Sequence, residues 1–143
     1  MERGSSVEIV ALLFVIVTLP LIIRTSRKFK IYAGGIVIGT ALIFLIGELT
    51  IKVRTDFFSI GRQEWHNQGF AEDMGKWVVP FFLLGVAIFL ILVNIRMIQQ
   101  FLKRKDGIRW VWIAFVVVID VFALFLVPML LFFVAFMFFP FAP

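Results

Sequence analysis

The chain has 143 residues, of which 62% are hydrophobic and 16% are charged, and its mean hydropathy is +1.07. Soluble globular chains are roughly half apolar and about a quarter charged, so this composition, with its 19 phenylalanines, excludes an ordinary soluble domain and indicates a protein whose solvent is lipid. The net charge of +5 does not indicate nucleic-acid binding, because Lys and Arg stand in short blocks beside apolar segments, and the lack of cysteine excludes disulfides and thiolate metal sites.

The apolar segments, taken in chain order, predict an all-α bundle of four transmembrane helices that forms one domain over residues 1–143. The first segment has no small-residue cleavage site before the next charges, so we expect it to be retained rather than removed as a signal peptide. Glycines in the long connection after the second helix predict a loop or a short interfacial helix. The expected helices cover about residues 7–23, 31–51, 77–98 and 109–139, and the long connection covers residues 52–76.

The last apolar segment is the longest, and Asp120 is its single charged residue after Arg109. A helix over 109–139 would reach roughly 46 Å at about 1.5 Å per residue, against a hydrocarbon layer of about 30 Å. It must therefore tilt, kink or protrude, and Pro128 is the expected position of a kink.

Two short basic connections predict how the chain is oriented. Cytoplasmic loops carry an excess of Lys and Arg, so we expect both connections in the cytoplasm, with the two termini and the 52–76 loop outside. This arrangement describes a multi-pass protein of the cell membrane whose basic blocks also contact anionic lipid. The basic residues are Arg24, Arg27, Lys28 and Lys30 in the first connection and Lys103, Arg104 and Lys105 in the second.

Asp120 is the first candidate for a functional polar group. Counted from Arg109, it lies roughly 16 Å into the membrane, where a carboxylate costs about 2.5 to 3.5 kcal/mol. It serves either as a proton- or cation-coupled site or as a contact to a cationic group on a partner. Otherwise it is a protonated side chain that holds the bundle through a helix neighbour such as Asn94 or Thr40.

Glu48 is expected nearer the outer boundary of its helix, one turn before Lys52, and an interfacial ion pair is its simplest role. Glu8 of the first helix offers a second carboxylate on the same side. If the two lie close together, they could share a proton or bind a cation.

Small residues on two helices predict faces that pack against other helices. Gly35 and Gly39 form a G-x-x-x-G pattern, which favours either packing inside the bundle or a dimer contact. Further small residues at heptad spacing are Gly34 and Ala41 on the second helix and Ala87, in register with Asn94, on the third.

The long connection carries the single histidine and several aromatic residues. One His with scattered carboxylates gives no recognised ligand spacing, so neither a metal nor another cofactor is expected. Contact with an extracytoplasmic protein or with lipid headgroups suits these side chains better. The candidate contact residues are Phe57, Phe58, Trp65, His66 and Phe70.

The sequence has no motif for a catalytic nucleophile, a zinc site, a phosphate-binding loop or haem. The leading hypothesis is therefore a non-catalytic membrane subunit or partner-binding protein, of an accessory or immunity type, that contacts another membrane protein or a second copy of itself. The alternative is a small homo-oligomeric proton-coupled transporter or flippase that uses Asp120 and Glu48. A third hypothesis is an enzyme that acts on lipid-linked substrates with polar groups of the outer interface.

Overall fold

The computed structural model describes residues 5–23 and 25–139 of the chain. The described part is all-helical, with 87% helix and no strand, which confirms the all-α part of the predicted fold class. The helices are α1 (Ser5–Ile23), α2 (Arg27–Arg54), α3 (Arg62–Asn67), α4 (Phe70–Lys103) and α5 (Arg109–Phe138).

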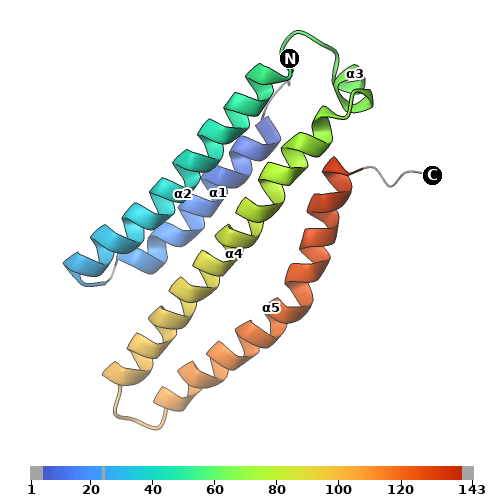
Figure 1. The fold of residues 1–143 in the computed structure, drawn as a ribbon. Helices are drawn as coiled ribbons and strands as arrows, with labels where there is room; N and C mark the ends of the chain where they lie inside the picture. Colours follow the sequence, from blue (N-terminus) through green and yellow to red (C-terminus); the bar gives the residue numbers. More distant parts are fainter. Residues whose placement is uncertain (1–4, 24, 140–143) are drawn as a thin grey trace.

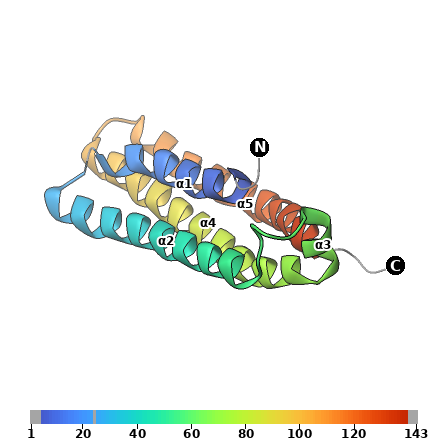
Figure 2. The same ribbon diagram turned by 90° about the horizontal axis from the view of Figure 1, so that it is seen from above.

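Two antiparallel helix pairs form the bundle, α1 with α2 and α4 with α5 (Figure 1). α4 is the central element, because it packs against α1, α2, α3 and α5, whereas α5 packs against α4 alone among the described helices. Seen from above, α4 lies between α2 on one side and α1 and α5 on the other (Figure 2). One end of the bundle, called the α3 end below, carries α3; the opposite end carries the α1–α2 and α4–α5 connections and is called the basic end.

Three helices, α2, α4 and α5, are long and apolar enough to cross a membrane. α1 has a shorter apolar part, Glu8–Ile23. The predicted ranges 7–23 and 109–139 correspond closely to α1 and α5.

α2 extends further than its apolar residues predict, because it begins at Arg27 rather than at residue 31 and continues to Arg54. Ser26 precedes the helix in an extended conformation, and its hydroxyl accepts a hydrogen bond from the backbone N–H of Phe29 at 3.4 Å. This is the capping geometry that lets a helix begin in a polar segment.

The predicted loop over residues 52–76 is wrong in extent, because α4 begins at Phe70 rather than at residue 77. Gly69 adopts a left-handed conformation, with φ of +81°, and turns the chain into α4. In the first turns of α4, Lys76 Nζ lies 3.3 Å from Glu72 Oε1 and 3.4 Å from Asp73 Oδ1. These pairs are four and three residues apart, the spacings at which ion pairs support a helix. The actual connection therefore covers residues 55–69 and contains α3.

α5 bends along its length in Figure 1, and Pro128 lies inside it. A proline in a helix removes one backbone hydrogen bond and displaces the carbonyl of the preceding turn, so it accounts for the bend. The bend fits the expected way of placing a helix of this length across the bilayer.

Two clusters of buried apolar residues hold the bundle together. The first, at the α3 end, joins all the helices and includes Trp65, Met74 and Val78. The second, nearer the basic end, joins α1, α2 and α4 through Ile22, Val37 and Leu92. No described residue of α5 is buried, so this helix adds to the bundle with one partly covered face only.

The glycines that pack tightly are not those of the G-x-x-x-G pattern. A Cβ built on Gly34, Gly35 or Gly39 would meet nothing within 4 Å, so these residues form no close helix contact within the described chain. The helices instead approach at Gly47, where a Cβ would overlap the indole of Trp77, and at Gly75, where it would overlap Phe138. Packing of the G-x-x-x-G glycines inside the described bundle is thus not seen, and their alternative role in a dimer contact stays a prediction.

Candidate functional site

A buried lysine between two carboxylates is the most polar site at the α3 end. Lys52 Nζ lies 2.6 Å from Glu48 Oε1 in the next turn of α2 and 2.7 Å from Glu8 Oε1 on α1. Glu48 is 1% exposed and Lys52 is 4% exposed, whereas almost half of the Glu8 side chain is exposed. The expected Glu48–Lys52 pair is present, and Glu8 joins it.

An aromatic layer covers this cluster. The indole N–H of Trp65 donates a hydrogen bond of 2.9 Å to Thr55 Oγ1, and both residues are buried. The ring of Phe57 has its centroid 5.5 Å from Lys52 Nζ, within cation–π range, and packs edge-on against Trp65. α3 is thereby fixed to the end of α2.

The cluster fastens α1 to α2. Its lysine neutralises one of two carboxylates and links α1 to α2, and Glu48 Oε2 is buried with no hydrogen-bond partner among the described residues. In a low-dielectric site a charge that cannot reach water must be paired, so the three groups depend on one another.

A second polar contact joins α4 to α5. Asn94 Nδ2 donates to both carboxyl oxygens of Asp120, at 3.0 Å and 3.1 Å, and both residues are half-buried. Asn94 Oδ1 is buried without a partner in the described part of the chain. The neighbour of Asp120 is thus an amide of its own bundle, as one of the two interpretations of this residue expected.

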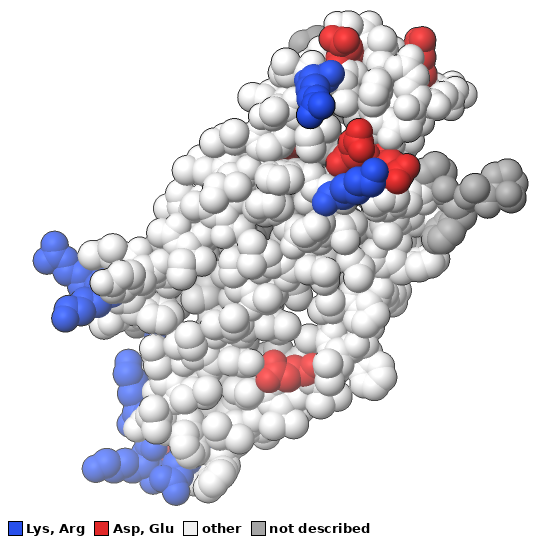
Figure 3. All heavy atoms as spheres, in the orientation of Figure 1, with Lys and Arg blue, Asp and Glu red and all other residues white. Residues whose placement is uncertain are grey.

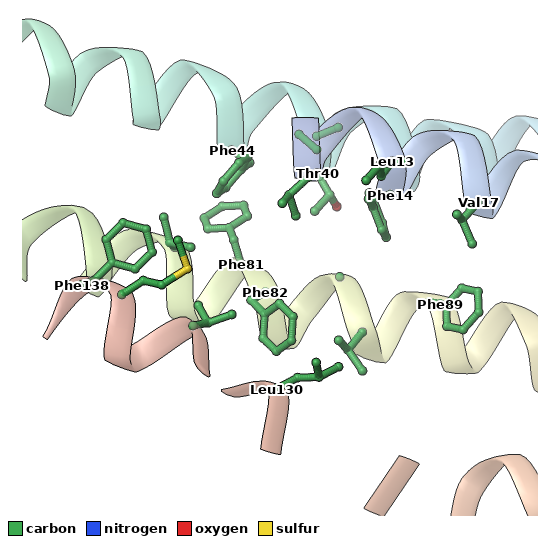
Figure 4. Close-up of a pocket in the computed structure, with 18 residues that line it drawn as sticks. Leu13, Phe14, Val17, Thr40, Phe44, Phe81, Phe82, Phe89, Leu130 and Phe138 are labelled. Carbon is green, nitrogen blue, oxygen red and sulfur yellow. The ribbon is translucent and has the colours of Figure 1, made fainter. Parts of the chain in front are cut away.

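The structure hollows out a large apolar groove between these two polar sites. The groove has a volume of about 590 Å³ and is lined by 18 residues of α1, α2, α4 and α5. α4 forms its floor, and α1 and α5 form walls that do not contact each other in the described chain. Rings from several helices, among them Phe14, Phe81 and Phe82, point into the space (Figure 4).

Most of the basic residues lie at one end of the molecule. On the visible face, most Lys and Arg side chains gather at the basic end, whereas the α3 end carries most of the acidic side chains with a smaller number of Lys and Arg among them (Figure 3). At the basic end, two arginine side chains lie over aromatic rings. The Cζ of Arg109 is 5.5 Å from the ring centroid of Trp110, and the Cζ of Arg104 is 5.9 Å from that of Trp112. Exposed side chains of this group are Arg27, Lys28, Lys30, Lys103, Arg104 and Lys105, and Arg24 lies outside the described residues.

The aromatic residues expected to face outward are divided between the interior and the surface. Trp65 is 4% exposed and belongs to the first buried cluster, with Phe57 and Phe70 packed against it. Phe58 is 50% exposed, and His66 packs edge-on against Trp65. Among the described residues no group of three or more His, Cys, Asp or Glu side chains could hold a metal ion.

The remaining candidates have ordinary surroundings. Ala41 is buried on α2, whereas Ala87 is exposed on α4.

Sequence reasoning missed two features, because neither has a local pattern. One is the groove, and the other is the hydrogen bond of 3.2 Å that the indole N–H of Trp77 donates to the carbonyl of Phe44. The spacing of large rings along α4, at Trp77, Phe81 and Phe89, was the one available signal of an aromatic-lined face.

Comparison of the chain with protein-family models, with curated proteins and with solved structures found no match. The class of protein therefore follows from the structure alone. Three long apolar helices, with basic residues at one end, are compatible with a multi-pass membrane protein.

Proposed function

We propose that this chain is a four-span protein of the cell membrane and acts as a non-catalytic, partner-binding subunit. In this arrangement α1 crosses the bilayer beside α2, with which it pairs along its length. The basic end faces the cytoplasm, and the α3 end and both termini face outward, because Lys and Arg concentrate on the cytoplasmic side of membrane proteins.

The observation that carries the partner-binding proposal is the isolation of α5. This helix contacts α4 alone, and none of its described residues is buried. Leu124 and Phe125, near its middle, are 73% and 77% exposed. A thirty-residue helix held on one side only offers the rest of its surface to a neighbouring transmembrane segment.

The polar groups support binding over catalysis and transport. Lys52 pairs with Glu8 of α1 as well as with Glu48 of its own helix, and Asn94 of α4 donates to Asp120 of α5, so both polar sites join neighbouring helices. The groove between the two sites has Thr40 as its single polar side chain, which leaves no row of hydrophilic groups for an ion to follow across the bundle.

Site-specific photo-crosslinking in native membranes tests this proposal. A photoreactive amino acid replaces Leu124 or Phe125 on α5, and the matched control carries it at Ile43 of α2, which is 57% exposed. We expect α5 to yield one discrete adduct with a membrane protein, either another chain or a second copy, while α2 yields lipid adducts. Equal lipid labelling at both helices would contradict the proposal.

Proton-coupled transport by a homo-oligomer is the second candidate, and the half-buried carboxylate of Asp120 favours it. Asp120→Asn preserves the size of the side chain and its capacity to pair with Asn94 while removing the titratable group. In proteoliposomes, a transporter would lose proton flux and keep its assembly. A partner-binding subunit would show no flux before or after the change.

A further inference from the structure

We infer that the groove between α1, α4 and α5 is a binding site for one acyl chain of a membrane phospholipid. The chain would enter at the α3 end and extend toward the basic end. This inference needs the membrane placement of the bundle but is independent of any protein partner on the outer face of α5.

The lining of the groove matches a hydrocarbon and no polar ligand. None of its 18 residues carries a charge, and the hydroxyl of Thr40 is its single polar side-chain group. Ligand sites of small molecules have volumes of roughly 300 to 1,000 Å³, and the groove, at about 590 Å³, lies in this range.

A groove of this size in a bilayer must be occupied. Apolar cavities of about 150 Å³ can stay dry and empty inside proteins, but this space is several times larger and lies between two walls that do not touch. Water has almost no polar group to bind there. Lipid chains are the abundant apolar molecules at this depth.

The shape of the lining favours a flexible chain over a transmembrane helix. Helices pack closely in membranes where small residues let their backbones approach. Large rings occupy this groove instead, with Phe14 from α1, Phe44 from α2 and Phe82 and Phe89 from α4, and they divide it into spaces between side chains (Figure 4). A methylene chain can follow such spaces, whereas a helix cannot enter without displacing the rings.

The position of the groove indicates where the lipid enters. Ala11 and Phe44 lie in the lining one helical turn from Glu8 and Glu48, the charged cluster of the α3 end. Val17 and Phe89 mark the other end of the groove, toward the basic end, and Leu130 lies between the two ends, near Phe82 (Figure 4). A phospholipid with its headgroup beside the half-exposed Glu8 would therefore place its methyl terminus near Val17 and Phe89.

Labelling with photoreactive lipid tests the site directly. The full chain is reconstituted in phosphatidylcholine nanodiscs that contain a small fraction of phosphatidylcholine with a diazirine either near the carbonyl or at the end of one acyl chain. After irradiation, labelled residues are mapped by peptide mass spectrometry. Terminal diazirine should label the Val17 and Phe89 end, and carbonyl-proximal diazirine should label the Val78 and Phe138 end, each several-fold above Ile36 and Ile43 on the lipid-facing side of α2.

Filling the groove provides the matched control. A Cβ at Gly85 would meet the Phe14 ring at 3.7 Å, an ordinary contact, so Gly85→Leu extends into the groove, whereas Gly35→Leu extends into open space on α2. We expect Gly85→Leu to lower groove labelling several-fold and Gly35→Leu to leave it unchanged. Leu130→Phe, which fills the groove from the α5 wall, gives the same readout if Gly85→Leu does not fold.

Uniform labelling of the groove and of α2 would overturn the inference, since it would mean surrounding lipid only. A reversed order of the two diazirine positions would also overturn it, and so would a groove protected by a stoichiometric protein partner. None of these results bears on whether α5 binds a protein through its outer face, so the failure of one proposal is distinguishable from the failure of the other.

Discussion

Lys52 is the side chain on which the α3 end depends most. Its ammonium group stands between Glu8 and Glu48, and Glu48 is almost entirely buried. Half of this arrangement is predictable from the sequence, because Glu48 and Lys52 are one helical turn apart. Glu8 lies 44 residues from Lys52, and its contribution depends on how α1 packs against α2, which no local pattern contains.

We expect Lys52→Met to destabilise the protein by about 3 to 5 kcal/mol, because it leaves the Glu48 carboxylate buried without its counter-ion. Unfolding in mild detergent, followed by tryptophan fluorescence, measures the effect. Adding Glu48→Gln to this variant should restore much of the loss. Lys76→Met is the control, since its ion pairs are exposed and little change is expected. Equal effects of the two lysine changes would contradict the assignment.

The Asn94–Asp120 contact should couple α4 to α5 by about 0.6 kcal/mol, and by no more than about 1.7 kcal/mol. A double-mutant cycle with Asn94→Ala and Asp120→Ala, measured by detergent unfolding, gives this coupling energy. Asp120→Asn should cost less than Asp120→Ala, since an amide can still pair with Asn94. Strictly additive single changes would show that the contact does not hold the two helices.

Helix ends illustrate what hydropathy can and cannot predict. The apolar segments located the long helices, but the predicted ranges of α2 and α4 began too late and ended too early, because hydropathy detects the membrane-embedded part of a helix only. Ser26 and Gly69, which begin α2 and α4, are recognisable turn and capping residues. Taken as a helix start, Gly69 indicates that α4 begins near Phe70.

Close approach of α2 and α4 depends on Gly47, since a Cβ there would overlap the indole of Trp77. We expect Gly47→Val to destabilise the bundle by about 1 to 3 kcal/mol through forced displacement of that ring. Gly35→Val, on an exposed part of the same helix, is the matched control and should change stability far less. Thermal unfolding of both variants in one detergent makes the comparison, and a larger loss for Gly35→Val would refute this packing.

The arrangement of the helices as a bundle was predictable in outline. The two short basic connections were predicted on the same side of the membrane, and both do lie at one end of the bundle. The groove was not predictable, because it arises where α1 and α5 both pack on α4 without meeting each other. Which helices leave a space between them depends on contacts between distant parts of the chain.

Cysteine accessibility tests the membrane arrangement most directly, because the natural chain has no cysteine and each engineered one reports alone. Ser26→Cys and Asp106→Cys place a thiol in the two basic connections, and Ser59→Cys places one at the α3 end; all three positions are exposed. With a membrane-impermeant maleimide on intact cells, Ser59→Cys should react at once, and the other two should react only after permeabilisation. Reaction of Ser26→Cys and Asp106→Cys from opposite sides, or of Ser59→Cys from the cytoplasm, would contradict the account.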